Sequence, residues 1–160
     1  MNNNKDYVLA IDNGTQSVRA LVFDLDGQLV AKSKVEIEPY FSQHPGWAEQ
    51  RVEYFWDKLC QACQGLWPQL DFPRSAIRSL ALTTQRATVV NLDSNGQALR
   101  PAIVWLDQRL EQRLPGMGLW GLLLGLAGER ETVRFFRSQS EAHWIRNNQP
   151  EIWQRTAHFL

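Results

Sequence analysis

The sequence lacks the charge imbalance and the long apolar run that mark several common classes of protein. Lys and Arg together number 17, Asp and Glu also number 17, and the formal net charge is zero. Nothing in this balance attracts nucleic acid or an anionic membrane surface. The longest apolar stretch, from Gly116 to Gly128, is about 13 residues, short of the roughly 20 that span a bilayer. We therefore expect neither nucleic acid nor a membrane as a partner.

Cysteine is also scarce, with only Cys60 and Cys63 in the chain. Their C-x-x-C spacing is typical of metal or redox sites, but no second pair and no nearby His completes four ligands. Apolar residues recur around them at helical spacing. We interpret both thiols as part of the apolar face of a helix.

A secretory signal is missing too, since the residues before Tyr7 are polar. Hydrophobic residues make up 44% of the chain and charged residues 21%, as in an ordinary globular protein. The chain is long enough for one domain with a real core. We expect a folded cytoplasmic protein.

The sequence is organised around the stretch from Val8 to Asp24. Two apolar runs flank an Asn-Gly pair, a pattern that predicts a β-hairpin. Gly14 can adopt backbone angles closed to other residues, and residues 15–17 add donors of the kind that hold phosphate oxygens. Asp12, at the end of the first strand, could hold Mg²⁺ through water. An ordinary turn that binds nothing is the alternative.

The segment from Asp12 to Arg19, followed by Phe23-Asp24 and Asp26-Gly27, resembles the first phosphate motif of the FGGY carbohydrate kinases. This family includes glycerol kinase and xylulokinase. The likeness continues through His44 to Gln50, Thr83 to Arg86 and Pro101 to Arg109. Four motifs in the family's order make a specific match. Members of the family are much longer, so the chain resembles an N-terminal fragment of such a kinase.

The residues themselves predict a mixed α/β domain. We expect an antiparallel meander, a helix ended by Pro68, a buried strand and two short strands, at about 7–12, 18–24, 29–38, 52–67, 76–83, 88–93 and 102–105. The resemblance implies that this core, to about residue 105, has the ribonuclease-H-like fold shared with actin and the large heat-shock chaperones. The domain would be the incomplete N-terminal one, with the second domain absent.

The remainder, about 106–160, has the character of a helical segment. Helices are predicted over 106–113, which Pro115-Gly116 would end, 132–148 and 150–158, with Ser138 or Ser140 as a cap and Pro150 at a helix start. The stretch from Leu119 to Leu126 is too uniformly apolar to leave a polar face. We expect it to be buried, or to pack on a part of the protein missing from this chain.

The resemblance implies that ATP and Mg²⁺ are the cofactors and places the hairpin turn around them. The cofactor-binding residues would be Asp12, Asn13, Gly14, Thr15, Gln16, Ser17 and Arg19, with Asp12 reaching the metal through water. Arg19 carries a permanent charge with a forked donor geometry that suits phosphate oxygens. Its alternative role is that of a solvated charge at a strand edge.

The sugar site implied by the resemblance begins with Gln85 and Arg86, which follow an apolar strand. Glycerol kinases have a glutamate after that arginine, whereas this chain has Ala87. Glycerol is therefore disfavoured, because a buried hydroxyl without a partner costs roughly 1–3 kcal/mol. Trp105 and Asp107 resemble a pentulose-kinase arrangement and could supply an aromatic wall and a carboxylate. Their alternatives are a core tryptophan and an aspartate at a helix N-terminus.

No catalytic residue is expected within this chain, because the family's catalytic aspartate and its adenine-binding motif lie beyond the position of Leu160. We predict ATP-dependent phosphorylation of a sugar or polyol, a pentulose or related carbohydrate, by a longer parent protein, which could be a homo-oligomer. A non-catalytic half-domain or degenerate kinase that binds a ligand or partner is the alternative. An actin-like or chaperone-type ATPase ranks third, because Gln85-Arg86 resembles the sugar kinases specifically.

Overall fold

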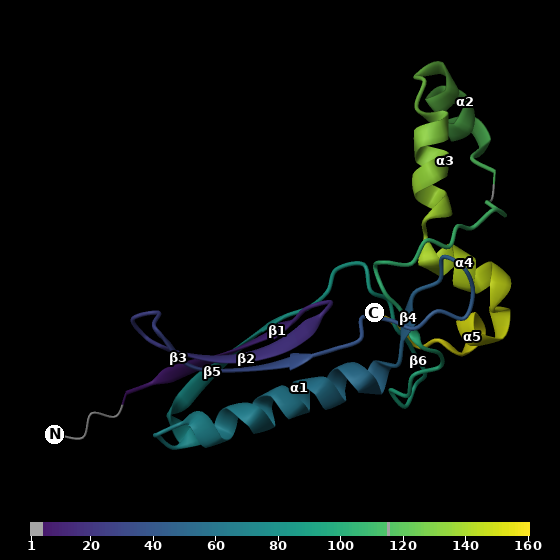
Figure 1. Ribbon diagram of the computed structural model, residues 1–160. Coiled ribbons are helices and arrows are strands. Elements are labelled where there is room, and N and C mark those ends of the chain that lie inside the picture. Colours follow the sequence, from purple (N-terminus) through teal and green to yellow (C-terminus); the bar gives the residue numbers. More distant parts are fainter. Residues whose placement is uncertain (1–4, 115) are drawn as a thin grey trace. The chain divides into compact units, whose positions relative to one another are not determined.

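The computed structural model describes residues 5–114 and 116–160, and Figure 1 shows its elements. The chain folds into two compact units. The first contains residues up to Tyr40 together with Gln50–Ala87, and the second contains Phe41–Glu49 and Thr88–Leu160. The strands that we placed in the core near residues 88–105 thus belong to the second unit. Each unit is described by itself.

The first unit is built on a four-stranded sheet with the order β3-β2-β1-β5. Its strands are β1 (Tyr7–Asn13), β2 (Ser17–Asp24), β3 (Leu29–Glu36) and β5 (Ile77–Thr83). The pairs β1–β2 and β2–β3 are antiparallel, while β1 and β5 are parallel. The predicted meander is confirmed, with boundaries within two residues of those expected.

Helix α1 (Val52–Leu66) packs on β2 and β3 and closes the hydrophobic core. Core residues alternate along β2, where Val18, Ala20 and Val22 point inward, as expected for a strand with one buried face. Figure 1 shows α1 lying along the sheet. The helix ends at Leu66, and Pro68 falls in a short 3-10 turn, η1 (Trp67–Gln69). A proline is tolerated there because the first turn leaves its N–H groups unpaired.

Cys60 and Cys63 are free, half-buried thiols on α1. Cys63 packs against the hydrophobic core. Burial, reinforced by the neighbouring Cys60, raises the pKa of the Cys63 thiol. A raised pKa disfavours the thiolate that metal binding and redox chemistry require. The interpretation of these cysteines as part of a helix face is confirmed.

Strand β5 differs from the prediction. We expected it to be buried, but most of its residues are exposed, including Leu80 and Leu82. The reason is its position: β5 is the last strand of the sheet, and α1 packs chiefly on β2 and β3. The apolar residues of a strand are buried only where another layer of the protein packs on that strand.

The second unit contains two small sheets. In one, β4 (Glu49–Gln50), whose first residue belongs to this unit, pairs with β7 (Ala102–Ile103). In the other, β6 (Asn91–Leu92) pairs antiparallel with β8 (His158–Phe159). The strands predicted at 88–93 and 102–105 are thus shorter than expected. Strand β8 was missed, because its pairing residues lie more than sixty positions away in sequence.

Four helices complete the described part of the second unit: α2 (Gly118–Leu126), α3 (Arg130–Ser138), α4 (Glu141–Asn148) and α5 (Pro150–Arg155). The single helix predicted over 132–148 is wrong. It divides at Gln139 and Ser140, and the Ser140 hydroxyl accepts a hydrogen bond from His143 N at 3.4 Å as the cap of α4. Pro150 begins α5, as predicted.

The helix predicted over 106–113 does not form, because side chains take the backbone donors that a helix would use. Asp107 Oδ1 accepts from Arg109 N at 2.9 Å, and Glu111 Oε1 accepts from Arg113 N at 2.5 Å. Aspartate commonly bonds to the backbone two residues on and so competes with helix formation. The predicted break at Pro115 lies outside the described residues.

Helix α2 is exposed, contrary to the first of the two expectations for it. Leu119 and Leu126 are 82% and 81% exposed, and Trp120 is also largely exposed. Figure 1 shows α2 and α3 as adjacent helices of one hairpin. No helix within the described ranges is both long enough and apolar enough to span a membrane.

Candidate functional site

Three polar side chains form a row across the end of the first unit's sheet. Asp12 of β1 lies opposite Arg19 of β2 and Thr83 of β5 in the strand register. Arg19 Nη1 donates to Asp12 Oδ2 at 2.8 Å, and Thr83 Oγ1 donates to Asp12 Oδ1 at 3.0 Å. The Asp12 side chain is 39% exposed. Arg19 is thus paired rather than simply solvated, and the carboxylate stays open to solvent.

The turn between β1 and β2 is closed by its own backbone. Gly14 N donates to Ser17 O at 3.1 Å, and Gln16 O accepts from Ile37 N at 3.0 Å. Gly14 does not use the left-handed backbone angles that are open to glycine, because its φ is not positive. Its role is steric: a Cβ at Gly14 would lie 3.1 Å from Ser17 O and would crowd the turn.

The side chains of the turn differ in how far a ligand can reach them. Gln16 is exposed, Thr15 is half-buried and already makes interactions within the chain, and Ser17 is buried. Asn13 Oδ1 is buried and has no hydrogen-bond partner among the described residues. Leaving such an acceptor unsatisfied costs about 1–3 kcal/mol, so a donor such as a bound water is favoured there.

Asp12 and Asn13 suit a hydrated Mg²⁺ ion. Mg²⁺ prefers oxygen ligands and keeps several of its waters, so it needs only one or two carboxylates from a protein. Asp12 offers an accessible carboxylate, and the unpartnered Asn13 Oδ1 would accept a hydrogen bond from a metal-bound water. Within the described parts of the chain, no group of three or more His, Cys, Asp or Glu side chains could form a denser metal site.

Gln85 and Arg86 follow the end of β5 at Thr83. Gln85 Nε2 donates to Gly14 O at 3.0 Å and so joins this segment to the hairpin turn. The Arg86 side chain is exposed and forms no hydrogen bond or ion pair with the described residues. The next residue, Ala87, has φ of 56°, a left-handed conformation that costs a non-glycine residue about 1–2 kcal/mol. Arg86 is therefore available to an external ligand, whereas one donor of Gln85 is already used.

In the second unit, Asp107 is buried and its carboxylate is fully occupied. Oδ2 accepts from Ala48 N at 2.6 Å and from Arg109 Nη2 at 2.7 Å, and Oδ1 accepts from Arg109 Nε at 2.7 Å. The alternative role for Asp107, at a helix N-terminus, is wrong because no helix forms there. Its side chain therefore links the backbone of Ala48 to the side chain of Arg109.

Arg109 is the centre of a buried ionic network. Its guanidinium lies 4.0 Å from the ring centre of Trp47 and 4.6 Å from that of Trp144. Arg109 Nη2 also donates to Glu49 Oε1 at 2.9 Å, and Arg100 pairs with the same oxygen. Burial lowers the pKa of the Arg100 guanidinium, and the attraction of Glu49 opposes that change. The ion pairs, together with the two indole rings that lie against the Arg109 guanidinium, hold the chain around residue 107 in one conformation.

This ordered segment forms one side of a pocket of about 500 Å³ in the second unit. Trp105 is 51% exposed, so its alternative role as a core tryptophan is wrong. The lining residues are Trp105, Asp107, Gln108, Arg109, Leu110, Phe135, Gln139 and Glu141. Sequence reasoning missed Phe135, Gln139 and Glu141. The break between α3 and α4, which it did not predict, separates the helical residue Phe135 from Gln139 and Glu141.

The predicted residues thus fall into two groups. Asp12, Gly14, Arg19 and Gln85 come together around the hairpin turn, and Arg86 follows in the same unit. Trp105 and Asp107 line a pocket of the second unit. An antiparallel meander joined through a helix to a parallel strand, with a polar turn at the end of the sheet, defines a ribonuclease-H-like α/β domain.

Comparison with known proteins makes the assignment specific. Residues 7–160 match the model of the FGGY family of carbohydrate kinases, N-terminal domain, and the chain belongs to this family. It is 36% identical over 118 residues to a glycerol kinase of Ralstonia nicotianae, covering 71% of this chain and 24% of that protein. A glycerol kinase of Saccharopolyspora erythraea is 38% identical over 106 residues, covering 66% and 21%.

Solved structures agree with this family and fold. A xyloylose kinase from Brucella ovis matches with a TM-score of 0.75 and 25% identity, covering 96% of this chain and 32% of that one. A glycerol kinase from Plasmodium falciparum with ADP matches with a TM-score of 0.64 and 24% identity, covering 94% and 30%. The expected fold is confirmed. The chain spans less than a third of the length of these relatives.

Proposed function

We propose that the protein to which this chain belongs transfers the γ-phosphoryl group of ATP to a hydroxyl of a sugar or polyol, with a pentulose or related carbohydrate as the preferred substrate. The observation that carries the proposal is the row of Arg19, Asp12 and Thr83 beside the unpartnered Asn13 oxygen. It lies at the turn whose sequence resembles the family's first phosphate motif, in a chain of the carbohydrate kinase family.

Asp12 is proposed to hold Mg²⁺ through water, and the ion would neutralise charge on the nucleotide phosphates. Arg19 orients the Asp12 carboxylate through their 2.8 Å bond, and its remaining donors can face phosphate oxygens. Gln16 and Thr15 supply polar groups at the tip of the turn. Gly14, which has no side chain, lets a phosphate group approach the backbone closely. Ser17, which is buried, would act through its backbone.

Arg86 is proposed to bind substrate hydroxyls, because it is an exposed cation without a partner among the described residues. Gln85 would fix the position of Arg86 through its bond to the Gly14 carbonyl. The absence of a carboxylate at Ala87 favours substrates other than glycerol, since no acceptor stands beside the arginine.

Trp105 is proposed to pack against the carbon face of a bound carbohydrate, because it is half exposed at the edge of a polar pocket. Asp107 would support the sugar site by holding this segment in place, because both of its oxygens already accept hydrogen bonds. Trp105 would thus contact the substrate directly, and Asp107 would position it.

The base that accepts the proton of the attacking hydroxyl is proposed to lie outside these residues. Asp12 is assigned to the metal, and the carboxylate of Asp107 is occupied by internal donors. Residues 1–160 alone would then be inactive. The protein would work in the cytoplasm.

A second candidate is a non-catalytic domain that binds a partner. The exposed apolar surface of α2, with Leu119, Trp120 and Leu126, favours it. Both candidates have the same fold, and they differ in whether the protein phosphorylates a substrate.

The direct test is a panel of pentuloses, hexuloses, glycerol and other polyols, assayed for ADP release by the full-length protein with Mg²⁺ and ATP. We expect turnover with one carbohydrate and little with glycerol. No turnover with any acceptor, in a protein that is folded and binds a partner through α2, would favour the non-catalytic domain instead.

A further inference from the structure

Three arginines of α3 line a small pocket in the second unit. Arg130, Arg134 and Arg137 are spaced by four and three residues, a spacing that places side chains on one face of a helix. The pocket has a volume of about 170 Å³. It is separate from the larger pocket lined by Trp105, with which it shares no lining residue.

The charges of Arg130 and Arg134 are not balanced within the described residues. Neither Arg130 nor Arg134 forms an ion pair or hydrogen bond there through its side chain, and both are exposed. Arg137 is half-buried and makes a contact of its own. Guanidinium groups sharing one pocket repel one another, and a bound anion would relieve that repulsion.

The nearby carboxylates do not fill this role. Glu129 and Glu131 are exposed residues of the same helical segment, yet no ion pair links them to Arg130 or Arg134 in the part of the chain that the structure describes. Glu111 accepts from Arg113 N and from Asn148 Nδ2, so both of its oxygens are used elsewhere. The guanidinium groups of Arg130 and Arg134 are therefore open to an external ligand.

The rest of the lining indicates what kind of anion fits. Gln112 adds an amide group, and Leu114 and Met117 add apolar surface. Arginine binds phosphate oxygens through its planar fork, and a phosphate group carries about −1.5 to −2 charges at neutral pH. Apolar surface beside the arginines suits the carbon chain of a phosphate monoester.

We propose that Arg130, Arg134 and Arg137 form a binding site for a phosphate group, supplied either by inorganic phosphate or by a small phosphate monoester. The site lies on α3, whose Phe135 lines the larger pocket, so the two sites share one helix. The proposal depends only on the second unit and stands apart from the proposed kinase activity.

The test is calorimetric titration of the full-length, nucleotide-free protein with inorganic phosphate and, separately, with glycerol 3-phosphate at constant ionic strength. The double variant Arg130→Gln/Arg134→Gln should weaken binding at this site at least about tenfold. Arg146→Gln, which changes an exposed arginine of α4 outside the pocket, is the matched control and should leave the affinity unchanged. Tighter binding of one probe identifies the source of the phosphate group.

Equal phosphate affinity in the double variant and the wild-type protein would overturn the proposal. Displacement of phosphate by an equal concentration of chloride would overturn it as well, because it would show non-specific attraction of anions. The thermal unfolding temperature of the double variant should match that of Arg146→Gln, since Arg130, Arg134 and Arg146 are all exposed. This comparison separates a loss of binding from a loss of folding.

Discussion

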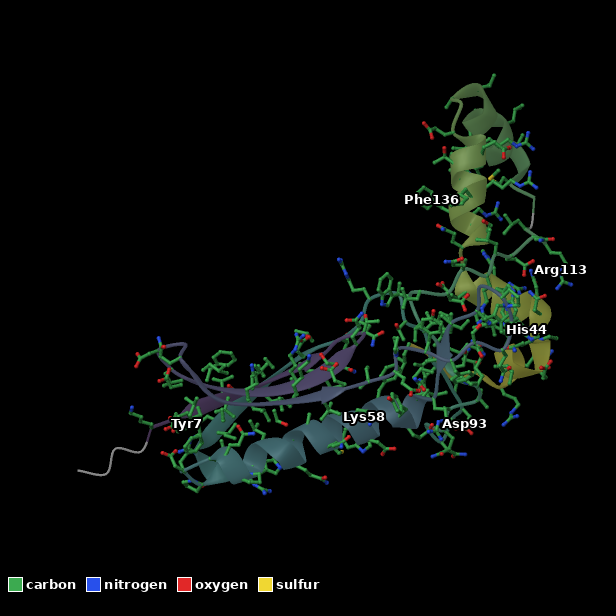
Figure 2. All side chains as sticks on the ribbon, in the orientation of Figure 1. Tyr7, His44, Lys58, Asp93, Arg113 and Phe136 are labelled. Atoms are coloured by element: carbon green, nitrogen blue, oxygen red, sulfur yellow. The ribbon has the colours of Figure 1, made fainter. Side chains whose placement is uncertain are left out.

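Arg109 and Asp107 are joined side chain to side chain by two hydrogen bonds of 2.7 Å, from Nε to Oδ1 and from Nη2 to Oδ2. Both side chains are almost fully buried, at 2% and 4% exposure. The rings of Trp47 and Trp144 lie against the same guanidinium. His44, labelled in Figure 2, contacts Trp47 at 4.4 Å between ring centres. This arrangement fixes the loop that carries Trp105 to Gln108.

Arg109→Lys should destabilise the second unit by about 3 kcal/mol, because a lysine keeps the charge but loses the two-pronged bond to Asp107 and the stacking on two indoles. Denaturant unfolding followed by tryptophan fluorescence measures the change. Arg146→Lys, at an exposed position whose side chain has no hydrogen-bond or ionic partner among the described residues, should change stability by less than about 0.5 kcal/mol. Equal stability of the two variants would show that the network contributes little.

Arg86→Ala should raise KM for the carbohydrate about tenfold or more while changing KM for ATP little, because Arg86 is assigned to the sugar and makes no internal bond within the described residues. Initial rates with each substrate varied in turn give both constants. Arg78→Ala is the control, since Arg78 of β5 already pairs with Asp6 and has no assigned contact with the substrate. A defect confined to ATP would remove Arg86 from the sugar site.

Asp93 should make the stability of its turn depend on pH. Hydrogen bonds from Gln97 N and Asn95 N to its carboxylate lower the pKa of Asp93. Because the pKa of Asp93 is lower in the folded state than in the unfolded state, its ionised carboxylate stabilises the folded protein. This stabilisation is fully present above the unfolded-state pKa, about 3.9, and is lost as the pH falls through the folded-state pKa. Gly96, at φ of 75°, completes this turn.

The measurement is thermal unfolding of the wild-type protein and Asp93→Asn at pH 6 and at acid pH. The difference between the two proteins should be larger at pH 6 and should shrink as the Asp93 carboxylate is protonated. Asp26→Asn, at an exposed turn position, serves as the control. A difference that grows toward acid pH would contradict the assignment of a lowered pKa.

The sequence predicted best what local chemistry determines. The β1–β2 hairpin follows from two apolar runs around a short polar turn, although Asn13 ends β1 and the Asn-Gly pair itself does not form the turn. The position of α1 follows from apolar residues at helical spacing. These features need no information from distant residues. The pairing of Asp12 with Arg19 was not predicted, because it depends on the register of the two strands, in which Asn13 still pairs with Val18.

Features that depend on distant partners were missed. The segment after Trp105 has the charges of a helix, but Asp107 bonds to Ala48 and Arg109 stacks on Trp47 and Trp144, so it adopts an irregular path. Strand β5 was expected to be buried, but it is an edge strand, and its burial depends on whether another element packs on it. The part of the larger pocket formed by Phe135, Gln139 and Glu141 depends on a helix break at Ser140, which the sequence offered as a cap but not as the boundary between two helices.

The measurement that tests the central claim most directly is the turnover of the full-length protein with its best carbohydrate after Asp12→Asn. This change keeps the shape of the side chain but removes the charge that would hold Mg²⁺ and pair with Arg19. We predict that kcat/KM for MgATP falls at least about 100-fold, while Asp26→Asn in the following turn behaves as the wild type. Wild-type turnover by Asp12→Asn would contradict the placement of the nucleotide and its metal at the β1–β2 turn.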